Sequence, residues 1–99
     1  MFSVLGDMGQ TNDSLSTLYH MLGDKHSRMV LLVGDLSYAD CEQSRWDSWG
    51  NMIELIASRK PLMVGAGNHE IEIQQKAGKA FTSFESRYRM PQVRGQVYE

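Results

Sequence analysis

Residues 30–40 constrain the fold more than any other part of this chain. Their sequence is VLLVGDLSYAD, an unbroken apolar run followed by glycine and an acidic turn. Such a run, bounded by Arg28 and Gly34, is typical of a central parallel β-strand with both faces covered. A strand of this kind delivers the residues that follow it to the carboxyl edge of the sheet, where open α/β folds bind ligands. Asp35 and Tyr38 are therefore candidate site residues.

Two other apolar stretches end in the same way. Their sequences are FSVLGD at residues 2–7 and LMVGAGNHE at residues 62–70. Parallel strands in one sheet lie about 4.8 Å apart, so the three turns meet at one edge. We expect Asp7, Asp35 and Asn68 to converge on one cavity.

Helical patterns separate the three strands. An apolar stripe with Gly23 as its stop follows the first strand, which spans residues 2–6, and its members are Leu15, Leu18, Tyr19 and Leu22. The expected N-cap of that helix is Asn12, Asp13 or Ser14. After the second strand, at residues 28–34, a helix over residues 43–59 is expected to pack its apolar side chains on the sheet: Trp46, Trp49, Ile53 and Ile56. Pro61 begins the third strand.

The order strand-helix-strand-helix-strand predicts an α/β fold with parallel strands and right-handed crossovers. Beyond residue 70 the pattern weakens. Residues 71–79 are expected to form a surface loop, and Phe81, Phe84 and Tyr88 to share one face of a short helix before Pro91. With no repeat or linker, the 99 residues predict one domain at most.

Composition excludes several function classes. The net charge of −2 gives no footprint for nucleic acid, and no basic cluster indicates a membrane surface. No apolar run approaches the ~20 residues of a membrane span. Cys41 is the only cysteine and is expected to be an inert loop thiol. His20 and His26 are expected to be solvated.

The chain begins inside a strand and stops at residues 97–99 (VYE) in what looks like another element. We therefore expect residues 1–99 to be a fragment or an incomplete gene product.

The converging side chains indicate metal chemistry. Two carboxylates, a phenol and an amide oxygen are hard donors that suit trivalent iron, manganese or zinc. A carboxylate such as Asp35 can bridge two ions, and two ions roughly 3.5–4 Å apart are a standard device for hydrolysing phosphate esters. Tyr38 must lose its proton to bind a metal, which favours a strongly acidic ion such as Fe(III).

Three motifs carry a family resemblance. They read GDMG at residues 6–9, GDLSY at 34–38 and GNHE at 67–70. They resemble the first three of five motifs in purple acid phosphatases of the calcineurin-like metallophosphoesterase superfamily. Residues 34–40, 45–50 and 84–91 also resemble the plant-like, high-molecular-weight branch. The tyrosine three residues after Asp35 separates this family from calcineurin-type protein phosphatases.

The resemblance implies the N-terminal half of an αββα-type sandwich that hydrolyses phosphate monoesters by metal-bound hydroxide, in a secreted or vacuolar setting. It implies that Asp7 and Tyr38 bind Fe(III), and that Asp35 bridges to a second ion (iron, zinc or manganese) bound by Asn68. His69 would contact the phosphate and assist protonation. We further expect Asp40 to orient His69.

The remaining family motifs, of Val-x-x-His and Gly-His-x-His type, supply three histidine ligands, and none is present among the histidines of this chain, which are His20, His26 and His69. We also expect this chain to lack the fibronectin-like domain that precedes the catalytic domain in the plant branch. We therefore expect weak binding of the metal pair and little activity from this chain by itself.

Three alternatives differ in function. A phosphodiesterase or nucleotide pyrophosphatase would use the same scaffold, and a non-catalytic binding module would keep the fold without the metals. A plain nucleotide-binding domain is disfavoured because no Gly-x-Gly-x-x-Gly or Walker-type loop follows the first strand. The expected partner is a phosphate ester substrate, with no nucleic acid or membrane, and no oligomeric state is predicted.

Overall fold

A parallel sheet organises the computed structural model, which describes residues 1–73 and 79–91. Within those residues its three strands lie in the order β1-β2-β3, with bounds Phe2–Leu5, Met29–Leu32 and Leu62–Val64. Phe2 pairs with Met29, and Val30 with Leu62. The predicted α/β class, the alternation of strands and helices along the chain up to residue 64, and the parallel pairing are confirmed.

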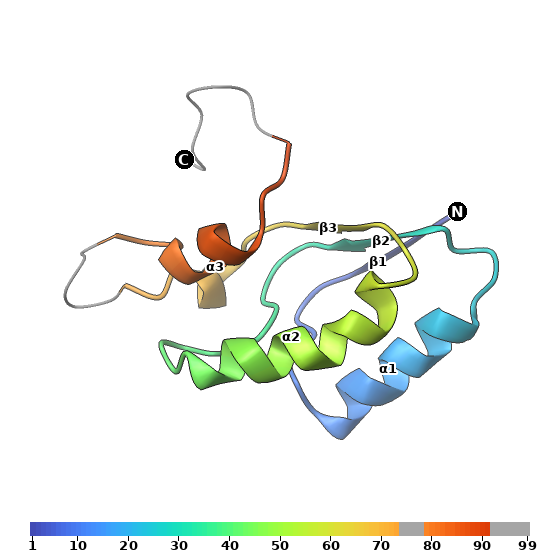
Figure 1. Cartoon of the computed structure of the whole chain (residues 1–99), viewed down its shortest axis with the longest axis horizontal. Helices are drawn as coiled ribbons and strands as arrows, with labels where there is room; N and C mark the ends of the chain where they lie inside the picture. The colour runs from blue at the N-terminus through green and yellow to red at the C-terminus, as the bar shows by residue number, and fades with distance from the viewer. Residues whose placement is uncertain (74–78, 92–99) are drawn as a thin grey trace.

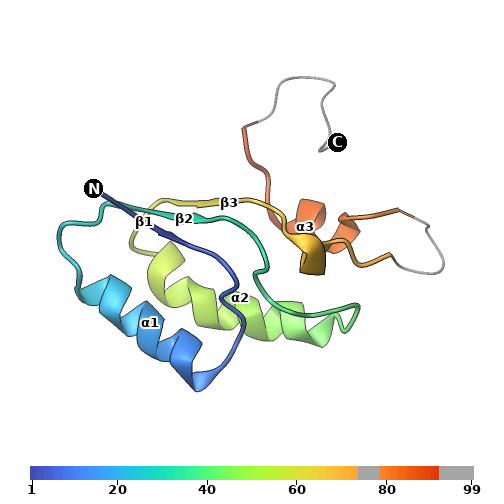
Figure 2. The same ribbon diagram turned by 180° about the vertical axis from the view of Figure 1, so that it is seen from behind.

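Both long helices lie against the same face of the sheet (Figures 1 and 2). Helix α1 spans Asn12–Gly23 and α2 spans Ser44–Ala57. Right-handed crossovers that always step in one direction, from β1 to β2 to β3, put each connecting helix on the same side. A 3-10 turn, Asn68–Glu70, and the short helix α3, Thr82–Arg87, lie beyond the carboxyl edge of the strands.

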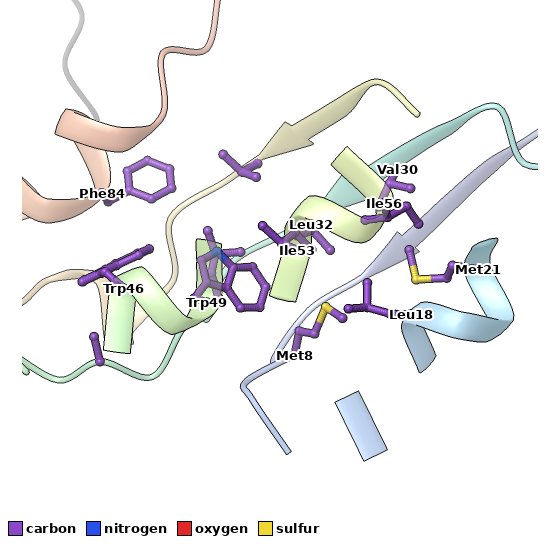
Figure 3. Packing of buried hydrophobic residues seen from close by; sticks show 13 residues of the cluster. Met8, Leu18, Met21, Val30, Leu32, Trp46, Trp49, Ile53, Ile56 and Phe84 are labelled. Atoms are coloured by element: carbon purple, nitrogen blue, oxygen red, sulfur yellow. The ribbon is translucent and has the colours of Figure 1, made fainter. Parts of the chain in front are cut away.

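The core fills the space between this face and the two helices (Figure 3). The predicted apolar side chains of α2 are all buried, with exposed fractions of 1% for Trp46, 0% for Trp49, 5% for Ile53 and 0% for Ile56. Leu18 of α1 and Val30 of β2 are fully covered as well. Trp46 also contacts the segment that follows β3. Its Nε1 donates to Glu72, and the Arg87 guanidinium of α3 lies 5.2 Å from the centre of its ring.

The other face of the sheet corrects one prediction. Val33 is 62% exposed, so within residues 1–73 and 79–91 the β2 segment is covered on one face and not on both. Its neighbours on that face alternate with the core positions and are exposed too: Phe2, Val4 and Met63. The continuous apolar run identified the strand correctly, but the layer that would cover its second face is not formed by these residues.

Helix α1 corrects two further predictions. Tyr19 is 58% exposed, because the buried positions are Ser14, Leu18 and Met21, and Tyr19 lies at the edge of that stripe. The N-cap is Thr11 and not one of the next three residues. The Thr11 hydroxyl accepts from the Ser14 amide at 3.2 Å, and the Ser14 hydroxyl accepts from the Thr11 amide at 3.0 Å.

The structure describes only part of the region beyond residue 70, so only some of the predictions for it can be compared. Phe84 is buried and its ring centroid lies 5.7 Å from that of Tyr88, whereas Phe81 precedes α3. Residues 74–78 of the predicted surface loop and the element predicted at 97–99 fall outside the described residues. His20, His26 and Cys41 are exposed as expected. None of the described helices has the length and hydropathy needed to cross a membrane.

Glycine allows the turns after β2 and β3 to touch. A Cβ added at Gly67 would collide with Asp35 Oδ1 and would lie 2.6 Å from the Asp35 backbone nitrogen. Gly34 faces the same contact from the other side, and its φ of +131° disfavours any side chain. The two loops can approach this closely only where neither carries a side chain.

Replacing Gly67 with alanine should therefore lower the free energy of unfolding by about 1–3 kcal/mol, the cost of overpacking. Gly50 is the matched control, because it lies in α2 with nothing within 4 Å of an added Cβ. Gly50→Ala should raise the free energy of unfolding by about 0.5–1 kcal/mol. Urea unfolding measures both, and equal effects would contradict the close contact.

Burial raises the pKa of the Tyr88 phenol, although its hydrogen bond from Trp49 Nε1, at 2.8 Å, opposes the shift. Above pH ~10 the phenol of the unfolded chain ionises first, so folding stability should fall as the pH rises toward the folded-state pKa. Tyr88→Phe should cost about 1–3 kcal/mol at pH 7, since Trp49 Nε1 loses its acceptor. The variant should then lose less stability than the parent on going to alkaline pH, as measured by urea midpoints; a parallel decline would contradict this assignment.

Candidate metal centre

The turns after β1 and β2 run side by side beyond the ends of their strands. The amides of Asp7, Met8 and Gly9 donate to the carbonyls of Gly34, Asp35 and Leu36 at 3.1, 3.1 and 2.9 Å. The sheet ladder thus continues into the motif residues, and it fixes the Asp7 turn in register with the Asp35 turn.

Left-handed backbone is concentrated in these turns. The φ angles are 52° at Asp7, 52° at Asp35, 50° at Tyr38 and 48° at Asp40. Aspartate tolerates this region better than most residues, whereas a bulky side chain such as tyrosine rarely adopts it. Conformations of this kind cost of order 1–3 kcal/mol each and cluster at functional sites.

Tyr38 joins the three turns. Its hydroxyl donates to Asp7 Oδ1 at 3.2 Å, and its ring centroid lies 4.2 Å from that of His69. Desolvation, followed by the hydrogen bond to Asp7 and the nearby carboxylates, raises the pKa of the Tyr38 phenol. The negative charges that keep the phenol protonated are the same charges that would attract a cation.

Asp35 lies between the other two turns. Its Oδ1 accepts from the His69 backbone amide at 2.9 Å. No described residue donates a hydrogen bond to its Oδ2, so that oxygen is free to bind another group. Asn68 begins the 3-10 turn beside it and is exposed.

His69 and Asp40 are in direct contact. His69 Nδ1 lies 2.7 Å from Asp40 Oδ1, and this hydrogen bond is the main reason that the pKa of His69 is raised; burial opposes it. The structure therefore brings together the two residues that we expected to pair. Their catalytic roles stay predictions.

The donor chemistry fits a hard cation. Oxygens bound to one octahedral ion at ~2.1 Å lie roughly 3 Å apart, which matches the 3.2 Å between the Tyr38 hydroxyl and Asp7 Oδ1. Asp35 adds a carboxylate from the neighbouring turn. Asn68 is exposed at the start of the 3-10 turn, and its amide stays a predicted ligand. In the part of the chain that the structure describes, no group of three or more His, Cys, Asp or Glu side chains is arranged to hold an ion. The candidate ligand set differs from such a group because it includes the phenol of Tyr38 and the amide of Asn68.

A cavity of about 520 Å³ opens beside Asp7 and Tyr38. Its walls come from the β1 turn, the start of α1 and the start of α2, and they include Gln10, Thr11 and Arg45. Gln10 bridges these elements, because its Nε2 donates to the carbonyls of Ser37 and Arg45, both at 2.8 Å. The candidate centre is therefore open to solvent on the Asp7 side.

Sequence reasoning missed one residue at the centre. Glu70 is fully buried, and its carboxylate accepts hydrogen bonds from the backbone of the Asp35 turn. The only signal in the sequence was its place at the end of the GNHE motif, directly after the residues assigned to the site.

The chain is similar to known phosphoesterases. The family model of the calcineurin-like phosphoesterases matches residues 2–97. Purple acid phosphatase 5 of Arabidopsis thaliana is 43% identical over 91% of this chain and 24% of its own length. The phosphoenolpyruvate phosphatase of onion, Allium cepa, is 44% identical over 93% of this chain and 20% of its own.

A solved structure shows the same fold. The purple acid phosphatase from yellow lupin (Lupinus luteus) seeds superposes with a TM-score of 0.76 and 28% identity, over 90% of this chain and 19% of that one. The chain thus spans about a fifth to a quarter of the relatives that it matches. With the family model covering nearly all of its residues, the chain belongs to the calcineurin-like phosphoesterase family.

Proposed function

We propose that this chain forms one part of a binuclear metal centre that hydrolyses phosphate monoesters. The observation that carries the proposal is the contact of three motif turns through Tyr38, which touches Asp7 with its hydroxyl and His69 with its ring. The relatives named as purple acid phosphatases and as a phosphoenolpyruvate phosphatase support a phosphate ester as substrate.

Each candidate ligand has a distinct place. Asp7 and Tyr38 would hold Fe(III), Asp35 would bridge the two ions, and Asn68 would bind the second ion. One relative is named an Fe(3+)-Zn(2+) purple acid phosphatase, which supports zinc as a candidate beside iron and manganese. When bound, such a pair of ions activates water and neutralises charge on the phosphate group.

His69 would supply the proton. Asp40 engages Nδ1, so Nε2 is the ring atom left to act on the substrate. The raised pKa of His69 favours the protonated ring, whose Nε2–H can donate to a phosphoryl oxygen or to the departing alkoxide. Asp40 would keep the ring in one orientation while this happens.

The exposed face of the sheet supports the proposal that this chain is one part of a larger domain. Val4, Val33 and Met63 lie exposed on the face opposite the helices, which in an αββα sandwich packs against a second sheet. We propose that the further ligands of the metal pair come from that second half, because the chain provides oxygen donors at the centre and His69 as its histidine there.

Iron binding tests the ligand set. Titration of the 99-residue chain with Fe(III) should give visible tyrosinate-to-iron absorption, although the binding should be weak. Tyr38→Phe should abolish the colour, whereas Tyr19→Phe should keep it, because Tyr19 is an exposed phenol on α1. Colour that survives Tyr38→Phe, or none in the parent chain, would contradict the proposed centre.

Activity tests the role of His69. Residues 1–99 can replace the matching segment of Arabidopsis purple acid phosphatase 5, and the chimera should hydrolyse p-nitrophenyl phosphate, whereas the isolated chain should be nearly inactive. His69→Ala in the chimera should lower kcat by about 10²–10⁴-fold, the usual contribution of a general acid. His20→Ala, an exposed histidine on α1, is the control and should leave kcat unchanged. A chimera that keeps full activity without His69 would refute its proposed role.

A further inference from the structure

Glu70 is a carboxylate buried in the contact between two motif turns. It is 0% exposed, and both of its oxygens accept backbone hydrogen bonds. Oε2 accepts from the amides of Asp35 and Gly67, and Oε1 accepts from the amide of Leu36, all at 2.7 Å. Distances this short are typical of strong hydrogen bonds to an ionised acceptor.

The hydrogen bonds that satisfy this carboxylate come from backbone amides. No Lys, Arg or His of the described residues forms an ion pair with Glu70. Burying a carboxylate is costly, and an apolar side chain would pack in such a place at less cost. What a carboxylate provides, and an apolar side chain cannot, is a fixed position for three amide groups.

Those amides belong to the two turns that carry the candidate ligands. The amide of Asp35, the proposed bridging residue, donates one of these hydrogen bonds, and the φ of Asp35 is 52°. Gly67 directly precedes Asn68, the proposed ligand of the second ion. Glu70 therefore ties the strained turn after β2 to the turn after β3, and it sets the distance between the two ligands.

We propose that Glu70 is a positioning residue that holds Asp35 and Asn68 at the spacing that a metal pair requires. This inference rests on the proposed function, because it concerns the geometry of that same centre. Glu70 acts through backbone amides and is not itself assigned as a ligand. Residues that orient metal ligands in this way typically change metal affinity by about 10–100-fold when they are replaced.

Glu72 provides a matched control two residues away. It is also buried, at 6% exposure, and its two oxygens accept from Trp46 Nε1 at 3.0 and 3.1 Å. Its partner lies on α2 and not in a motif turn. Loss of the Glu72 carboxylate should thus cost stability without moving the candidate ligands.

The test compares Glu70→Gln with Glu72→Gln in the 99-residue chain. Glutamine keeps the shape of the side chain, but its amide nitrogen must face at least one N–H donor at position 70. Glu70→Gln should weaken Fe(III) binding by about 10–100-fold, measured by titration of the visible absorption. Glu72→Gln should change that affinity by less than about threefold, even where its urea midpoint falls as far as that of Glu70→Gln.

The outcomes separate the inference from the proposed function. If the parent chain gives no iron colour, the proposed function fails; if the parent binds iron and both variants bind it alike, the positioning role is overturned. Amide exchange in the parent gives a measurement that does not depend on the folding of a variant. The Asp35, Leu36 and Gly67 amides should exchange slowly, whereas the Tyr38 amide, which has no acceptor among the described residues, should exchange fast. Equal exchange rates for these four amides would overturn the proposed positioning role of Glu70.

Discussion

Parallel pairing of β1, β2 and β3 is the constraint on which the rest of this structure depends. Because the strands run in one direction, each turn that follows a strand reaches the same edge of the sheet. The ladder does not stop at the last strand residue, since the amides of Asp7 and Met8 still bond to the turn after β2. Strand pairing thus continues into the turns that form the candidate site. The spacing of the strands therefore sets how far apart these turns lie.

Much of this organisation could be predicted from the sequence. Apolar runs that end in glycine and an oxygen donor located the three strands and their turns, and the spacing of Trp46, Trp49, Ile53 and Ile56 identified the buried face of α2. These signals are local, because periodicity is recorded along the chain itself. Asp40 was expected to orient His69, and the structure places the two side chains in contact, whereas the orienting role itself stays a prediction.

What the sequence could not provide depends on contacts between distant segments. The exposure of Val33 follows from both helices lying on one face, which an apolar run alone does not reveal. Tyr19 is exposed because α1 packs through Ser14, Leu18 and Met21, which leaves Tyr19 beside the contact. Glu70 was missed because a carboxylate that binds backbone amides leaves no pattern in side-chain types. Two of its three partners lie 34 and 35 residues away in the chain.

The uncovered sheet face has a consequence for how this chain behaves in solution. Phe2, Val4, Val33 and Met63 present apolar side chains to water on the face of the sheet opposite the two long helices. A contiguous apolar surface of this kind promotes contact between molecules, and net charge of only −2 offers little repulsion against it. Protein concentration should therefore govern whether the chain stays monomeric. Self-association will depend more on this exposed apolar face than on the candidate site at the edge of the sheet.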